Sequence, residues 1–251
     1  MRILLLSDIH SNLEALEACL DLAPPHDATV NLGDVVGYGA SPNEVSRAAR
    51  ELGGTFVRGN HDKVVAGIDS GEGFNPVAGI AAAWNREQLT AENLDWLRAL
   101  PQGPVEGAGF GGVQYVHGAA DDEDRYVVTL EDAVEQLAET RVGVTFFGHT
   151  HIQGAFVFDR GLVGDVIPEY ASVGKHETWN FHLITEAAYL INPGSVGQPR
   201  DADWRAAFAV FDSEERVVTF CRAPYNLRLA QQKIFDANLP AKLATRLAAG
   251  R

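Results

Sequence analysis

Short apolar runs and amphipathic stretches alternate along the first third of the chain. Residues 3–6 form a continuous apolar run that predicts a buried strand, and residues 13–22 carry apolar side chains at helical spacing. A second β-rich run, residues 28–32, ends at Gly33 and Asp34. Strand, helix and strand in this order predict a βαβ unit with two parallel strands.

The same patterns predict further elements up to residue 151. Ser41, Pro42 and Glu44 form a capping-box signal that opens a helix, which we expect to end near residue 52. Asn or Thr stands at a cap position before each of two later helical stretches. The elements expected after the first helix are strands at 55–57, 111–118 and 142–151 and helices at 74–90, 91–101 and 129–140.

Beyond residue 151 short strands are separated by Gly, Pro and Asp turns, which predicts antiparallel pairing. Two helices separated at Pro240 follow. These elements predict an α/β fold, a two-sheet β-sandwich flanked by helices, and a single domain of residues 1–251, because no repeat or linker marks a boundary. The expected later strands lie around residue 156 and at 181–183, 189–191, 207–211 and 217–220.

The composition is that of an ordinary globular chain, with 46% hydrophobic and 22% charged residues. No apolar run reaches the roughly 18 residues that span a bilayer, and the N-terminal run ends at Ser7 and Asp8, so we expect neither a membrane segment nor a signal peptide. Cys19 and Cys221 lie far apart in apolar patterns, which is typical of reduced thiols, although a single disulfide stays open. We therefore expect a cytoplasmic protein.

The formal net charge of −14 changes the range of expected partners. A nucleic-acid polymer or an anionic membrane needs clustered Lys and Arg, and the chain has no basic run. Neither is therefore expected as a partner. An anionic substrate would need a local source of positive charge.

Residues that bind cations follow five of the predicted strands. The carboxyl ends of strands in a mostly parallel sheet meet at one edge, so such residues can converge. The i, i+2 spacing of Asp8 with His10 predicts that both side chains lie on one side of an extended segment. Asp34 stands next to Gly33, and its two oxygens could bridge two cations. The strand-end residues are Asp8, His10, Asp34, Asn60, His61, His117, His149 and His151.

Two interpretations of these residues compete. Taken singly, each histidine is more typical of a surface or hydrogen-bonded core position than of a metal ligand. Five of the eight histidines, however, lie at predicted strand ends beside the carboxylates. Burying so many polar groups is unfavourable without a cation or a hydrogen-bond network, and the combination therefore favours a metal site.

The strand-end residues lie in five short motifs: Asp8-x-His10, Gly33-Asp34-x-x-Gly37, Gly59-Asn60-His61-Asp62, His117 and Gly148-His149-Thr150-His151. In this order they resemble the calcineurin-like metallophosphoesterase family, in particular its small bacterial and archaeal phosphodiesterase branch. The resemblance extends over residues 1 to about 200 if the segment 192–200 is included. It implies a four-layer αββα fold and a dinuclear metal centre.

The resemblance also implies a role for each residue. His61 would protonate the leaving group, and Asp62 would orient its ring. The cofactor would be two divalent metal ions, with manganese expected and iron, zinc, nickel or cobalt as alternatives. One ion would be held by Asp8, His10, Asp34 and His151, and the other by Asp34, Asn60, His117 and His149.

The function that follows is hydrolysis of a phosphodiester or phosphomonoester by a metal-bridging hydroxide, with His61 as general acid. Two divalent ions and two carboxylates leave roughly two net positive charges, which would attract an anion locally. The substrate would be a small phosphorylated molecule or a phosphoprotein, and a homo-oligomer stays open. The alternatives are a catalytically silent scaffold of the same fold and a nuclease, which the missing basic groove disfavours.

Some weaker signals lie near these motifs. Asn12 and Tyr38 occur in the expected site loops and could contact substrate, and Arg200 could meet a second phosphate. Hydrogen bonds within loops and an exposed turn arginine are the simpler interpretations. Residues 152–190 make a segment longer than the family core requires, for which we consider a cap, a dimer contact or extra strands.

Overall fold

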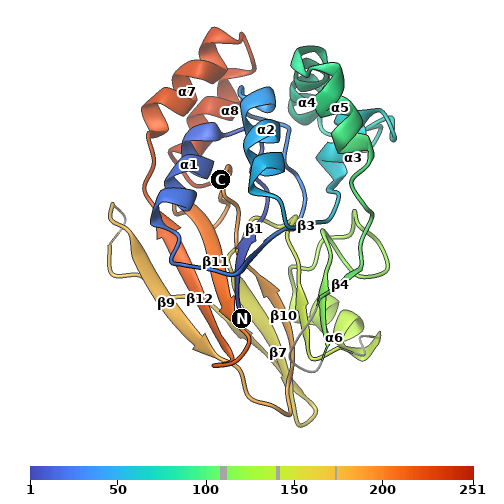
Figure 1. Ribbon diagram of the computed structural model, residues 1–251, viewed down its shortest axis with the longest axis vertical. Helices are drawn as coiled ribbons and strands as arrows, with labels where there is room; N and C mark the ends of the chain where they lie inside the picture. Colours follow the sequence, from blue (N-terminus) through green and yellow to red (C-terminus); the bar gives the residue numbers. More distant parts are fainter. Residues whose placement is uncertain (108–111, 140–141, 173) are drawn as a thin grey trace.

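The computed structural model describes residues 1–107, 112–139, 142–172 and 174–251. The strands occupy the lower half of Figure 1 and most helices the upper half, with α6 (Leu130–Glu139) beside the strands. No helix in these ranges has the length and apolar character needed to cross a membrane.

The first sheet has the N-terminal strand at its centre. In spatial order it consists of β3 (Thr55–Phe56), β2 (Ala28–Asn31), β1 (Arg2–Leu6), β11 (Ala206–Asp212), β12 (Val217–Ala223) and β9 (Glu177–His182). β1, β2 and β3 run parallel, as the βαβ pattern predicts, whereas β11, β12 and β9 pair antiparallel. The carboxyl ends of three parallel strands therefore meet at one edge.

The second sheet consists, in spatial order, of β4 (Val105–Gly107), β5 (Val113–Tyr115), β6 (Val144–Phe146), β10 (Ala188–Asn192), β7 (Gly154–Asp159) and β8 (Leu162–Val166). β5, β6 and β10 run parallel. The expected antiparallel pairing beyond residue 151 is therefore wrong for β10 on its β6 side. After β8 the chain crosses to the first sheet to form β9 and then crosses back to the second sheet. There β10 lies between β6 and β7.

Alternate side chains of β1 face opposite sides of the first sheet. Ile3 and Leu5 lie in the core between the sheets, and Leu4 and Leu6 lie under the helices. Both faces are covered, which explains the continuous apolar run. α6 covers the outer face of the second sheet. The helices on the first sheet's outer side are α1 (Leu13–Leu22), α2 (Pro42–Leu52), α3 (Asn60–Ala66), α4 (Pro76–Gln88), α5 (Ala91–Arg98), α7 (Leu227–Asp236) and α8 (Ala241–Leu247).

These layers confirm the predicted α/β fold with two packed sheets between helices. Several local expectations differ: α3 and β4 are not predicted, and the strand expected at 181–183 occupies Glu177–His182. Ser41 makes no side-chain capping bond at the start of α2, and its hydroxyl instead accepts a hydrogen bond from Lys233 at 3.2 Å. β8 was not expected, because Gly164 and Asp165 weaken its strand propensity. Residues 111 and 140, at the ends of an expected strand and helix, lie outside the described ranges.

Residues 152–190 contribute the edge strands β8 and β9, one to each sheet. Arg205, on the loop before β11, holds β9 in place. Its side chain is fully buried and forms ion pairs with Asp203 at 2.6 Å and with Glu177 of β9 at 2.9 Å. The Glu177 carboxylate also accepts hydrogen bonds from the Ala171 and Ser172 amides. The segment is thus tied to the first sheet by charge as well as by strand pairing.

This anchor predicts a pH-dependent contribution to stability. The hydrogen bond from Arg205 lowers the pKa of Glu177 from 4.5 to about 2. A carboxylate whose pKa is lower in the folded than in the unfolded chain stabilises the fold at pH values above its unfolded pKa. This stabilisation is lost as the pH falls toward the folded-state pKa of about 2. We expect Glu177→Gln to be less stable than wild type near neutral pH, with a difference that shrinks below about pH 4.5. Urea unfolding between about pH 7 and pH 3 measures this difference; a constant difference would contradict the assignment.

Candidate metal centre

The loops after β1, β2, β5 and β6 bring carboxylates and imidazoles together between the carboxyl ends of the two sheets. Two groups of ligand atoms form, and within each group the atoms lie within 4.8 Å of one another. Asp34 belongs to both groups. The first group is Asp8, His10, Asp34 and His151, and the second is Asp34, His117 and His149, all buried.

The backbone of these loops is left-handed. Asp8 and His10 have φ of 52° and 50°, and His149 and His151 have φ of 66° and 61°. The expectation of extended i, i+2 pairs is therefore wrong, although the side chains still converge. The left-handed conformation turns the chain sharply at each ligand. It costs non-glycine residues of the order of 1 kcal/mol each, and such strain is characteristic of functional sites.

Backbone carbonyls fix which ring nitrogen of each histidine is left to bind a metal. The Nδ1 atoms of His10, His117 and His151 lie 3.1, 2.7 and 2.6 Å from the carbonyl oxygens of Val36, Leu32 and Gln198. A carbonyl only accepts, so Nδ1 donates and Nε2 faces the carboxylates. The Nε2 atoms of His10 and His151 lie 3.1 Å apart, as expected for two lone pairs directed at one cation.

Each carboxylate divides its two oxygens between the protein and the cluster. Asp8 Oδ2 accepts from the Ser7 hydroxyl at 2.6 Å, while Oδ1, which faces the histidines, has no hydrogen-bond partner among the described residues. Asp34 Oδ1 accepts from the His61 amide at 2.8 Å. Asp34 Oδ2 lies 3.5 Å from Nε2 of both His10 and His117, which is the position of a bridging ligand.

Protonation of His117 shows how strongly the cluster attracts positive charge. Although burial opposes it, the charge of Asp34 raises the pKa of His117 to about 10. Burial likewise opposes ionisation of Asp34, but the charge of His117 holds the pKa of Asp34 well below its usual range. A proton thus neutralises part of the negative charge where a cation fits.

Two further residues complete the second group. Asn60 Oδ1 lies 3.2 Å from His117 Nε2. His149 donates from Nε2 to the Asp124 carbonyl at 3.0 Å, which leaves Nδ1 as its lone pair. Burial, followed by the charge of His117, lowers the pKa of His149 to about 3, so its ring is neutral. The donors are oxygen and nitrogen atoms without thiolate, a set that suits manganese, iron, zinc, nickel or cobalt.

His61 lies beside the first group. Its ring centroid is 4.9 Å from that of His10, and Phe74 packs on it at 4.5 Å. Gly37 allows this position, because an added Cβ there would lie 2.6 Å from His61 Nδ1. That nitrogen is buried and has no hydrogen-bond partner among the described residues, which leaves it available to a ligand.

Asp62 does not orient the ring of His61 as expected. Its two oxygens accept hydrogen bonds from the backbone amides of Val36 and Gly59, each at 3.1 Å. Burial and the charge of Asp34 raise the pKa of Asp62 to about 7. Asp62 therefore holds the loops after β2 and β3 together rather than the imidazole.

The three candidate substrate-binding residues, Asn12, Tyr38 and Arg200, differ in their position relative to the two ligand groups. Asn12 is the N-cap of α1, with Oδ1 accepting from the Ala15 amide and Nδ2 donating to the Gly197 carbonyl, so the fold uses both of its polar atoms. The ring of Tyr38 lies 4.6 Å from His10 and 4.4 Å from His61. Arg200 donates to the Tyr38 hydroxyl at 3.4 Å. Only Tyr38 and Arg200 thus adjoin the clusters.

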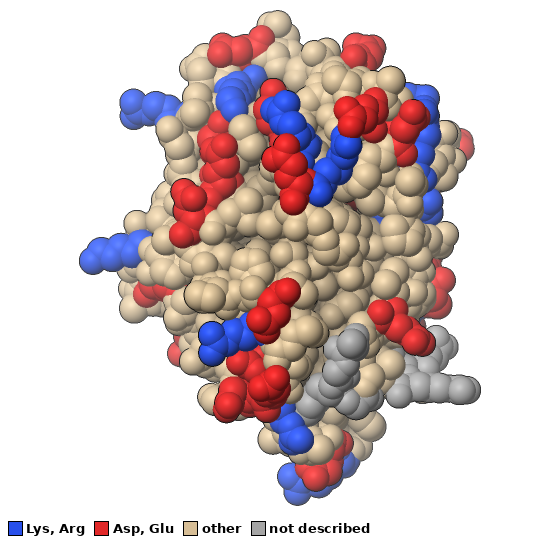
Figure 2. All heavy atoms as spheres, viewed as in Figure 1, with Lys and Arg blue, Asp and Glu red and all other residues tan. Residues whose placement is uncertain are grey.

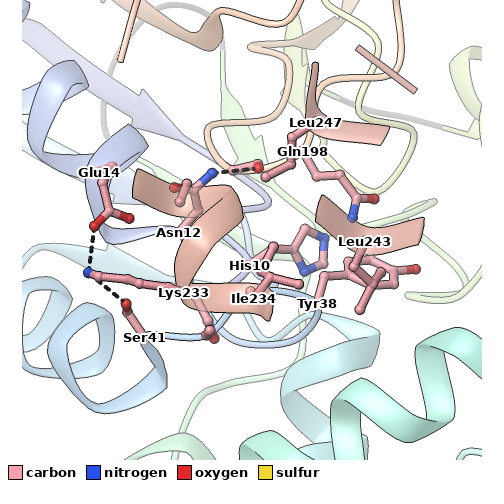
Figure 3. Close-up of a pocket in the computed structure, with 15 residues that line it drawn as sticks. His10, Asn12, Glu14, Tyr38, Ser41, Gln198, Lys233, Ile234, Leu243 and Leu247 are labelled. Atoms are coloured by element: carbon pink, nitrogen blue, oxygen red, sulfur yellow. Dashed lines mark hydrogen bonds and ion pairs between the residues drawn. The ribbon is translucent and has the colours of Figure 1, made fainter. Parts of the chain in front are cut away.

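The C-terminal helices α7 and α8 pack against residues next to the ligand groups. Figure 3 shows Lys233 of α7 between Glu14 and Ser41, which it contacts at 2.5 and 3.2 Å. Leu243 and Leu247 of α8 line the same small cavity as His10 and Tyr38.

Sequence patterns missed several residues around the ligands. Asn85 is fully buried in α4 and contacts the Ser11 hydroxyl, the Gly37 amide and the Gly39 carbonyl, so it fixes two site loops. An asparagine on the apolar face of a helix was the available signal. Tyr126, whose ring stacks on His149 at 3.8 Å, gave no such signal.

The two sheets and the buried clusters between their carboxyl ends define a metallophosphoesterase fold with two adjoining candidate metal sites. A family model for the calcineurin-like phosphoesterase superfamily domain matches residues 1–216, and the chain belongs to this superfamily.

Three relatives extend this comparison. The chain is 35% identical to the uncharacterized protein MJ0912 of Methanocaldococcus jannaschii, over 99% of this chain and 98% of that protein. A crystal structure of a metallophosphoesterase from Sphaerobacter thermophilus is 38% identical, with a TM-score of 0.82 over 100% of this chain and 99% of that one. The symmetrical bis(5′-nucleosyl)-tetraphosphatase of Yersinia enterocolitica is 33% identical over 106 residues, 39% of this chain and 35% of that protein.

The shared position of Asp34 predicts how metal binding fails. We expect Asp34→Asn to lower the occupancy of both metal sites, because Oδ2 faces both groups, whereas His117→Ala lowers occupancy of the second site only. After dialysis against manganese, elemental analysis should find close to no metal in Asp34→Asn and about half of the wild-type metal in His117→Ala. His182→Ala, an exposed histidine remote from the clusters, is the control. Equal loss in both site variants would contradict the bridging assignment.

Proposed function

We propose that the chain is a dinuclear metal-dependent phosphoesterase that hydrolyses a phosphomonoester or phosphodiester of a small molecule. The observation that supports this most is the Asp34 oxygen equidistant from His10 and His117, which joins two buried ligand groups into one centre. Two divalent ions held there would supply Lewis-acid stabilisation of phosphate oxygens and lower the pKa of water. Manganese is the ion that we propose.

His61 is suited to the departing oxygen. It lies against the first ligand group but its Nδ1 has no partner among the described residues. Burial lowers the pKa of His61 to about 4, so the ring is neutral in the protein without substrate. An anionic phosphate a few ångströms away favours the protonated ring, which can then donate its proton to the leaving group.

The space in front of His61 suits a small substrate. A cavity of about 410 Å³ is lined by Tyr38, His61, Phe74, Tyr126 and His149 among others, a volume typical of small-molecule sites. Its rim also carries acidic residues, which disfavours a polyanionic strand. Acidic and basic side chains are mixed over the helices on the face shown in Figure 2. We therefore propose a small phosphorylated molecule rather than a nucleic-acid polymer.

Hydrolysis assays test this function directly. Purified protein with added manganese should release nitrophenol from bis(4-nitrophenyl) phosphate or 4-nitrophenyl phosphate, and the rate of one over the other gives the diester or monoester preference. A panel of cyclic nucleotides, dinucleoside polyphosphates and phosphopeptides then narrows the substrate; the similarity to a bis(5′-nucleosyl)-tetraphosphatase is a reason to include the second class. A protein that binds metal but turns over none of these would support the scaffold alternative instead.

The role of His61 predicts a dependence on the leaving group. His61→Ala should keep both metals, because His61 belongs to neither ligand group. We expect kcat to fall by roughly 10²- to 10⁴-fold for an alkyl or phenyl ester, and much less for a nitrophenyl ester whose leaving group needs no proton. Steady-state kinetics with substrates of graded leaving-group pKa, together with metal analysis, measure this. An equal loss of kcat across the series would contradict general-acid catalysis.

A further inference from the structure

We propose that Arg200 and Arg246 form an anion subsite beside the metal centre that binds a second phosphate group of the substrate. The inference rests on the proposed phosphoesterase function and adds to it a substrate class: molecules with a phosphate next to the one that is cleaved. Arg200 lies in the loop between β10 and β11. Arg246 lies on α8, beyond the residues that match the family model.

Both guanidinium groups lie next to the same ring. The Arg200 and Arg246 guanidinium carbons are 5.9 and 5.8 Å from the centroid of Tyr38, and the same ring lies 4.4 Å from His61 and 4.6 Å from His10. Arg200 also donates its backbone N–H to the carbonyl of the candidate ligand His151 at 3.1 Å. Both cations therefore lie beside the ring that also contacts His61, the candidate general acid.

Neither guanidinium forms an ion pair with a side-chain carboxylate within the described residues. Arg200 donates to Gln198 Oε1 and the Tyr38 hydroxyl, and its buried Nε has no hydrogen-bond partner there. Arg246 donates from Nε to the main-chain oxygen of Arg251, the final residue of the sequence. Acidic residues outnumber basic ones by 14 in this chain, so a shortage of acids does not explain why both arginines beside Tyr38 lack a side-chain carboxylate.

The two arginines also repel each other. Burial, followed by the charge of Arg200, lowers the pKa of Arg246, and the charge of Arg200 contributes to lowering the pKa of both His61 and His151. Bringing like charges together and partly removing them from water is unfavourable unless an anion joins them. A phosphate fits, because the planar guanidinium fork binds two of its oxygens at once.

The surface next to this pair is open and basic. A cavity of about 490 Å³ is lined by Lys242, Arg246 and Arg251 with Asn75, and Asn75 also lines the cavity in front of His61. The two cavities thus adjoin at Asn75, on the side of the site that faces α8. The packing of Leu243 and Leu247 behind His10 holds α8, and with it Arg246, at a fixed position.

Binding of inorganic pyrophosphate and orthophosphate tests the subsite by isothermal titration calorimetry. Two preparations are needed: metal-free protein, and protein at fixed free manganese. Wild type should bind pyrophosphate more tightly than orthophosphate. Arg246→Gln should weaken pyrophosphate binding by about tenfold or more, with a smaller effect on orthophosphate, because a charge-assisted hydrogen bond to the second phosphate is lost.

Matched variants distinguish this role from a structural one. Arg246→Lys keeps the charge without the fork and should recover part of the affinity. Arg228→Gln, which removes an exposed arginine from α7, should bind both anions as wild type does. Circular dichroism shows whether Arg246→Gln is folded. If it is not, the pyrophosphate affinities of Arg246→Lys and Arg200→Gln test the subsite instead. Wild-type affinities that do not differ between the two anions, or folded variants with unchanged pyrophosphate affinity, would overturn the subsite.

Nitrophenyl ester hydrolysis by the preparation at fixed free manganese separates the two proposals. Arginine-dependent pyrophosphate binding in a protein that hydrolyses no ester would contradict the phosphoesterase function and leave the subsite standing. Ester hydrolysis with arginine-independent pyrophosphate binding would contradict the subsite alone.

Discussion

The shared Asp34 carboxylate is the interaction on which the rest of the site depends. One of its oxygens is held by a backbone amide of α3, and the other faces a histidine of each ligand group. Burying carboxylates and imidazoles at such distances is unfavourable unless positive charge compensates them. In the protein alone a proton on His117 supplies part of that charge, and Asp8 Oδ1 lies 3.1 Å from His151 Nε2 in the same cluster. A pair of divalent cations held by the two ligand groups would supply the compensating charge.

The fold provides the stiffness that this arrangement requires. Strands buried on both faces end at the site, and the loops then turn through left-handed conformations that a flexible chain would relax. Close approach adds a further constraint: a Cβ on Gly59 would lie 2.1 Å from Asp34 Oδ1, so only glycine lets the loop after β3 reach the bridging carboxylate. Asp62 and Asn85 then join neighbouring loops by hydrogen bonds. The strain is thus sustained by packing and polar contacts around it.

The sequence alone predicts those parts of the structure that follow from the local spacing of apolar and polar residues. The apolar run of β1 and the spacing of α1 predict the first layers, and His or Asp after each strand predicts the clusters, because strand ends converge whatever the loop conformation. It predicts neither the left-handed geometry of Asp8 and His10 nor the backbone partners of Asp62, since both depend on loops packed from distant segments. The parallel insertion of β10 was hidden for the same reason. Arg246 could not be found at all, because only tertiary packing brings α8 to Tyr38.

Charge distribution links the metal centre to the C-terminal helices. A chain with a net charge of −14 repels phosphate at a distance, so attraction must come from a few groups close to the reacting atoms. Arg200 and, from α8, Arg246 both lie beside Tyr38, whose ring contacts His10 and His61. The Lys233 to Glu14 ion pair and the leucines of α8 fix these helices against the loop after β1. Helices outside the family match therefore pack against the loop of His10, and in the proposed subsite α8 would add positive charge beside it.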